Sequence, residues 1–126
     1  MSVTILYIED NPDNRLLVRR VLEAEGYRVV EAEDGMRGME WLKSESPDLV
    51  LMDINLPEVD GYEVTKRLKQ LPLMDRVPVI AMTANVMRGD REKTIAAGCD
   101  GYIPKPIDID CLPEDIAKFL RKKDKK

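Results

Sequence analysis

Five short runs of apolar residues, separated by longer amphipathic stretches, constrain the fold of this chain more than any other feature. The runs are rich in Val, Ile, Leu and Tyr, and most of them lack the alternation of apolar and polar residues that marks a half-exposed strand. We therefore expect strands that are buried on both faces, as a parallel sheet requires. The expected strands are Val3–Ile8, Arg28–Ala32, Leu49–Asp53, Val77–Met82 and Gly101–Ile103.

The stretches between these runs carry apolar residues at helical spacing, which predicts one helix after each strand. The weakest is the fourth, whose middle is polar and contains Gly89. The expected helices are Asp13–Glu25, Met36–Ser44, Gly61–Leu71, Asn85–Ala97 and Leu112–Arg121. In the first two, the expected core positions are Leu17, Val21, Leu22, Met36, Met39 and Leu42, and Gly26 is expected to end the first helix. The alternation predicts an α/β fold with a doubly wound parallel sheet.

Length and composition narrow the function classes. The chain has 126 residues, 44% of them hydrophobic, which suits one globular domain. It has no histidine, which excludes Ser-His-Asp and Cys-His catalysis and His-ligated zinc in this chain. Cys99 and Cys111 are too few and too poorly spaced for a zinc cluster or a disulfide framework, so we expect free thiols. Neither a membrane span nor a signal peptide is expected, and the expected location is cytoplasmic.

Charge is unevenly distributed along the chain. Residues 1–63 carry 6 basic and 15 acidic groups, a balance of −9, and residues 64–126 carry 14 basic and 9 acidic groups, a balance of +5. A uniformly basic footprint for nucleic acid is therefore absent, and we expect neither nucleic-acid nor membrane binding. The acidic half could hold a cation.

Polar residues of complementary chemistry stand at the ends of four of the expected strands. They are Glu9 and Asp10, Asp53, Thr83, and Lys105. Because the carboxyl ends of parallel strands meet at one edge of a sheet, these side chains should converge. Three carboxylates repel one another, and Mg²⁺ with its preference for oxygen ligands is the usual remedy. A carboxylate beside Mg²⁺ can attack phosphorus, and a lysine and a hydroxyl can stabilise the transferred phosphoryl group.

Four stretches of the sequence resemble a known family, the receiver domains of two-component response regulators. They are residues 5–11 (ILYIEDN), 47–61 (PDLVLMDINLPEVDG), 78–84 (PVIAMTA) and 97–106 (AGCDGYIPKP). The resemblance extends over residues 3–120 and implies a flavodoxin-like (βα)₅ fold with strand order 2-1-3-4-5. It places the receiver domain at residues 1–121, followed by a basic tail at 122–126. Residues 85–98 further resemble single-domain cell-cycle regulators and the receivers attached to hybrid kinases.

The resemblance implies an acceptor and a metal site. Asp53 matches the phosphoacceptor. The Mg²⁺ ligands are matched by Glu9, Asp10, Asp53 and the backbone carbonyl of Asn55. Glu9 stands where the family more often has aspartate, a common variant whose longer side chain is expected to change water-mediated contacts and not function.

The resemblance also implies residues that bind the phosphoryl group and report it. Lys105 and Thr83 match the phosphoryl-binding pair, and Tyr102 matches the aromatic residue that changes rotamer together with Thr83. Ala84 matches the small residue after the hydroxyl, and Pro106 matches a proline that is typically cis. We expect the fourth helix, with few residues to bury, to move with this switch.

The expected partners and activity follow from the same resemblance. Since the chain has no histidine, the phosphoryl donor is expected to be a sensor histidine kinase or a histidine phosphotransfer protein, and the output is expected to be a protein contact. The expected catalysis is limited to the chain's own phosphoryl uptake and loss.

Two alternatives stay open on the residues alone. One is a Mg²⁺-dependent phosphohydrolase, because Asp53-Ile54-Asn55 loosely resembles the Asp-x-Asp motif of haloacid dehalogenases, although Asn55 replaces the second aspartate. The other is a flavodoxin-like nucleotide or flavin binder, although no glycine-rich loop follows the first expected strand.

Overall fold

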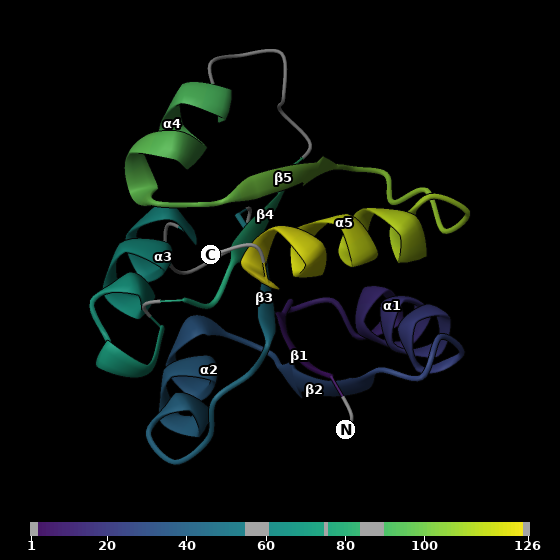
Figure 1. Ribbon diagram of the computed structural model, residues 1–126, viewed down its shortest axis with the longest axis horizontal. Helices are drawn as coiled ribbons and strands as arrows, with labels where there is room; N and C mark the ends of the chain where they lie inside the picture. The colour runs from purple at the N-terminus through teal and green to yellow at the C-terminus, as the bar shows by residue number, and fades with distance from the viewer. Residues whose placement is uncertain (1–2, 55–60, 75, 84–89, 125–126) are drawn as a thin grey trace.

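The protein is described here by a computed structural model, which covers residues 3–54, 61–74, 76–83 and 90–124. Within these residues, the strands form one parallel sheet in the order β2-β1-β3-β4-β5 (Figure 1). The strands are β1 (Thr4–Ile8), β2 (Arg28–Ala32), β3 (Leu49–Asp53), β4 (Val79–Thr83) and β5 (Gly101–Pro104). This confirms the doubly wound α/β fold and the expected strand order. Regular β4 pairing begins after Pro78, which has no N–H to donate to the sheet.

Helices cover both faces of the sheet. They are α1 (Pro12–Glu23), α2 (Gly35–Leu42), α3 (Gly61–Lys69), α4 (Asp90–Ala97) and α5 (Leu112–Asp124), with a short 3₁₀ turn, η1, at Pro72–Met74. Figure 1 shows α1 and α5 together on one side and α2 and α3 on the other. An apolar cluster lies between the sheet and the helices on each face. The cluster under α1 and α5 includes Tyr7, Leu22 and Ile116, and the cluster under α2 and α3 includes Ile8, Leu42 and Leu68.

Burial of the strands follows their place in the sheet. All residues of β3 and β4 are buried, and so is β1 from Ile5 onward. The expectation of burial on both faces is wrong for the two edge strands, where Arg28 and Glu31 in β2 and Tyr102 in β5 are exposed. An edge strand has a neighbour on one side alone, so charged residues are tolerated there and discourage pairing with other chains.

The first helix has well-defined ends. Asn11 caps α1 through its side-chain oxygen, which accepts two backbone N–H groups of the first turn at 2.8 and 3.1 Å, and Pro12 follows it. At the other end Gly26 adopts a φ of +89°, and the N–H of Tyr27 reaches back to the carbonyl of Leu22 at 3.2 Å. This left-handed turn confirms that Gly26 ends the helix.

Two expected core positions lie on the surface. Leu17 is 41% exposed and Met36 is 82% exposed. α1 buries Leu22 as expected, together with Val18 in place of Leu17. α2 approaches the sheet closely at Gly38, where an added Cβ would lie 2.6 Å from a methyl carbon of Ile8. The close approach leaves no room for a Cβ at Gly38 unless Ile8 moves.

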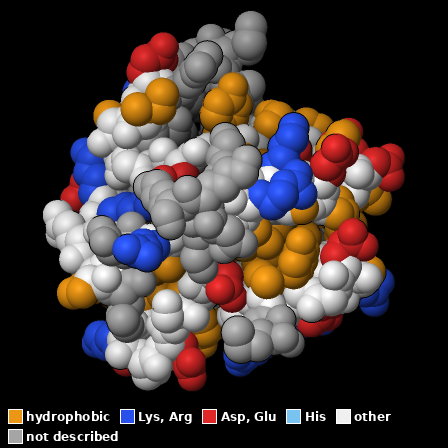
Figure 2. Space-filling view, in the orientation of Figure 1, with side chains coloured by type: hydrophobic (Ala, Val, Ile, Leu, Met, Phe, Trp, Pro, Cys, Tyr) orange, Lys and Arg blue, Asp and Glu red, His pale blue; other side chains and the backbone are white. Residues whose placement is uncertain are grey.

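Figure 2 shows basic and acidic side chains interspersed over the face in view. Within the described ranges, no helix is long and apolar enough to cross a bilayer. Of the expected fourth helix, residues 85–89 lie outside the described residues.

Candidate functional site

The register of the sheet brings the expected site residues to one edge. Ile8 at the end of β1 pairs with Met52, Asp53 at the end of β3 pairs with Met82, and Thr83 at the end of β4 pairs with Pro104. Glu9 and Lys105 each follow directly on their strand. Four neighbouring strands therefore end in polar residues at the same level of the sheet.

Three carboxylates converge at this edge. Glu9, Asp10 and Asp53 each offer an oxygen atom, and these atoms lie within 4.8 Å of one another. Glu9 and Asp53 are 1% exposed, whereas Asp10 is exposed and gives the cluster an opening to solvent. Clustered carboxylates of this kind are hard oxygen donors that suit Mg²⁺, which keeps several of its own waters.

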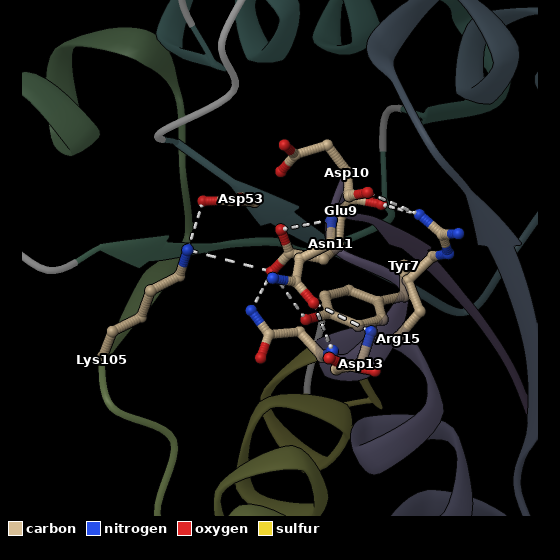
Figure 3. Close-up of polar contacts among 9 residues, drawn as sticks. Tyr7, Glu9, Asp10, Asn11, Asp13, Arg15, Asp53 and Lys105 are labelled. Atoms are coloured by element: carbon tan, nitrogen blue, oxygen red, sulfur yellow. Dashed lines mark hydrogen bonds and ion pairs between the residues drawn. The ribbon is translucent and has the colours of Figure 1, made fainter.

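Lys105 reaches into the acidic cluster from the end of β5. Its ammonium donates a hydrogen bond to Oδ1 of Asp53 at 2.7 Å and lies 3.8 Å from Oε1 of Glu9 (Figure 3). Its backbone N–H donates to the carbonyl of Thr83 at 2.8 Å, and the peptide bond to Pro106 is cis. The lysine head is thus placed beside the carboxylate at the centre of the cluster.

The electrostatics of the cluster favour an additional positive charge. The pKa of Glu9 is raised to about 7, first by burial and then by a side-chain hydrogen bond to Asp53 and the negative charge of Asp53. The Lys105 ammonium acts in the opposite direction and does not cancel these effects. Three carboxylates face one ammonium group, so a divalent cation would relieve the repulsion. The donor set and its charge therefore fit Mg²⁺.

Further residues support Glu9, and sequence reasoning missed them. The hydroxyl of Tyr7 and the side-chain amide of Asn14 both donate to Oε1 of Glu9, at 3.1 and 3.3 Å. Arg15 donates to the backbone carbonyls of Glu9 and Asp10 at 2.8 and 3.0 Å. Tyr7 could have been found, because it lies two residues before Glu9 and so on the same face of the strand. No sequence signal separates Asn14 and Arg15 from ordinary helix surface residues.

The other expected site residues lie as follows. Thr83 is buried, at 1% exposure, at the end of β4. Tyr102 lies on β5 and is 38% exposed, and Pro106 is exposed. Asn55 and Ala84 lie outside the described residues.

Solved structures similar to this chain are receiver domains. The receiver domain of a sensor histidine kinase from Pseudomonas aeruginosa PAO1, a structure with a magnesium ion coordinated in the active-site cleft, is 35% identical with a TM-score of 0.87. That match covers 96% of this chain and 99% of the other. A CheY-like receiver domain protein from Methanospirillum hungatei is 28% identical with a TM-score of 0.91, covering 99% and 98%.

Sequence comparison leads to the same family. The polar-differentiation response regulator DivK of Brucella ovis is 42% identical over 120 residues, which are 95% of this chain and 98% of that protein. The DivK of Brucella anthropi matches to the same extent. The family model for the response regulator receiver domain matches residues 5–117. With a parallel sheet whose strands end in an acidic cluster and a lysine, this chain belongs to the receiver domain family of the response regulators of two-component systems.

Proposed function

We propose that this protein is a phosphorylation-activated switch in which Asp53 accepts a phosphoryl group and Mg²⁺ assists the transfer. The observation that carries the proposal is the ion pair between Lys105 and Asp53 at 2.7 Å inside a cluster of three carboxylates. A buried carboxylate beside a lysine and a cation site is the arrangement that phosphoryl transfer to aspartate needs. The proposed donor is a sensor histidine kinase or a histidine phosphotransfer protein in the cytoplasm, and the proposed output is a changed contact with a protein target.

Glu9, Asp10 and Asp53 are the proposed metal ligands, together with the backbone carbonyl of Asn55, a residue outside the described part of the chain. When bound, Mg²⁺ supplies positive charge that offsets both the carboxylates and the incoming phosphoryl oxygens. The magnesium ion in the similar Pseudomonas receiver supports this assignment. The accessibility of Asp10 supports it too, because an entering ion must exchange some of its waters at an open side.

In the proposed step, an oxygen of Asp53 attacks the phosphorus atom of the donor. A new oxygen–phosphorus bond forms while the bond from phosphorus to the donor's histidine nitrogen breaks, and that nitrogen keeps the electron pair. The Lys105 ammonium, which starts 2.7 Å from Asp53, then interacts with the transferred phosphoryl oxygens. The product is an aspartyl phosphate.

We propose that Thr83 reports the phosphoryl group to the surface. Its side chain is buried next in line to Asp53 at the sheet edge, and its carbonyl accepts the N–H of Lys105. Movement of the Thr83 hydroxyl toward a phosphoryl group on Asp53 would be transmitted to the neighbouring β5, where Tyr102 is partly exposed. The proposed output surface therefore includes β5 and the adjacent helix α4.

Acetyl phosphate provides the test. With Mg²⁺, the intact mass of the protein should rise by one phosphoryl group, and chelation of Mg²⁺ by EDTA should suppress the increase. Asp53→Asn should abolish labelling, whereas Asp13→Asn, at an exposed carboxylate of α1, should leave it unchanged. Persistent labelling of Asp53→Asn would overturn the assignment. Steady turnover of a phosphate monoester would instead support the phosphohydrolase alternative.

A further inference from the structure

Tyr7 carries a polar group into the apolar cluster between the sheet and helices α1 and α5. Its side chain is 0% exposed, and its hydroxyl donates to Oε1 of Glu9 at 3.1 Å. A buried hydroxyl is costly unless it forms a hydrogen bond, so the tyrosine and the carboxylate constrain each other. Figure 3 shows the ring of Tyr7 beside Glu9, which lies between it and Lys105.

Asn14 reinforces the same contact from a different element. Its side-chain amide, on the first turn of α1, donates to Oε1 of Glu9 at 3.3 Å. The ammonium of Lys105 lies 3.8 Å from that same oxygen. The other oxygen, Oε2, accepts the backbone N–H of Asn11 at 3.4 Å. Most of the side-chain donors around Glu9 therefore gather on Oε1, which fixes the plane of the carboxylate.

Such anchoring matters more for a glutamate than for an aspartate. Glu9 has one more rotatable bond, so an unanchored carboxylate samples more orientations and loses more entropy when it is held at a metal. Hydrogen bonds to a metal-binding carboxylate fix its orientation, and their loss typically lowers metal affinity 10–100-fold.

We propose that Tyr7 and Asn14 are positioning residues for Mg²⁺ binding, which hold the Glu9 carboxylate in the orientation that the metal requires. The inference rests on the proposed function, since it concerns the same metal site. Neither residue needs to touch the metal or the phosphoryl group. Both act through Oε1 of Glu9.

The experiment measures the Mg²⁺ dissociation constant of the unphosphorylated protein by titration calorimetry. Tyr7→Phe removes the hydroxyl alone and should weaken Mg²⁺ binding about tenfold. Asn14→Ala should weaken it by a smaller factor, because Asn14 is partly exposed and its contact is longer. Tyr27→Phe is the matched control, since Tyr27 packs against the same apolar cluster and should leave Mg²⁺ affinity unchanged. If Tyr7→Phe fails to fold, Asn14→Ala decides the question alone.

A double-mutant cycle separates positioning from a general effect on the fold. In a Glu9→Ala background the effect of Tyr7→Phe on the Mg²⁺ dissociation constant should disappear, because the carboxylate that Tyr7 positions is gone. An effect of equal size in both backgrounds would overturn the inference. The inference would also be overturned if Tyr7→Phe and Asn14→Ala both bound Mg²⁺ as tightly as the wild type. The proposed function would still hold in that case, provided that the wild type binds Mg²⁺ and is labelled at Asp53. A wild type that does not bind Mg²⁺ would overturn both.

Discussion

Removing the charge of Glu9 should make the metal-free protein more stable. The carboxylate is buried beside Asp53, and its pKa is raised to about 7 from an ordinary value of 4.5. The folded state therefore binds a proton at pH values where the unfolded chain has already released it. In Glu9→Gln the amide can donate to Asp53 as protonated Glu9 does, while its oxygen still accepts from Tyr7 and Asn14.

The sign and size follow from this raised pKa. Below pH 4.5 both states are protonated at Glu9, and the group has no effect on the free energy of unfolding. Between 4.5 and 7 the folded state holds the extra proton, so stability falls as the pH rises, and above 7 the full penalty applies. A change from 4.5 to about 7 corresponds to roughly 3 kcal/mol. Near pH 5 the penalty shrinks to less than about 1 kcal/mol.

Urea denaturation of wild type and Glu9→Gln in EDTA measures this difference. At about pH 8 the variant should be the more stable protein by up to roughly 3 kcal/mol, and the gain should fall below about 1 kcal/mol at about pH 5. The same variant should gain less stability from added Mg²⁺ than the wild type, because a neutral amide is a weaker Mg²⁺ ligand than a carboxylate. Equal or lower stability of a folded Glu9→Gln at about pH 8 would refute the view that burial and repulsion at Glu9 destabilise the metal-free protein.

Three further predictions concern neighbouring residues. Asp10→Asn should keep the fold, since Asp10 is exposed, but Mg²⁺ should raise its thermal midpoint much less than that of the wild type. An equal rise in both proteins would count against the proposed Mg²⁺ site. Thr83→Ala should still be labelled by acetyl phosphate, but a phosphoryl mimic should change hydrogen exchange in α4 and β5 less than it does in the wild type. A change as large as in the wild type would show that Thr83 does not transmit the signal. Gly61→Ala should lower the free energy of unfolding in urea by about 1–3 kcal/mol, because its Cβ would lie 2.6 Å from Cα of Ile54. An unchanged free energy of unfolding would contradict this crowding.

The parallel sheet and the converging residues were predictable from the alternation of strands and helices, whereas the strand order came from the resemblance to receiver domains. Buried strands that alternate with helices form a parallel sheet, and their carboxyl ends must meet at one edge. Glu9, Asp53 and Lys105 stand at those ends in the sequence, so their proximity follows from counting residues. The structure bears out this proximity, since the Lys105 ammonium lies 2.7 Å from the Asp53 carboxylate.

Other features depend on how helices pack, which residue spacing does not determine. Leu17 and Val18 are adjacent apolar residues, and only the angle at which α1 meets the sheet decides that Val18 is buried and Leu17 exposed. Met36 is exposed because α2 turns a different face, which carries Gly38 and Leu42, toward the core. The hydrogen bond from Asn14 to Glu9 likewise depends on how the chain turns between β1 and α1, which the sequence pattern does not specify.

The central claim, that Asp53 carries the phosphoryl group, is tested most directly by locating the modification along the chain. Borohydride reduces an aspartyl phosphate to the side-chain alcohol and releases phosphate, with the hydride supplied by the reagent, so it leaves homoserine at the modified position. After treatment with acetyl phosphate and Mg²⁺, peptide sequencing by mass spectrometry should find homoserine at position 53 and at no other aspartate. Homoserine at position 10, or none in a protein that carries the phosphoryl mass, would contradict the account.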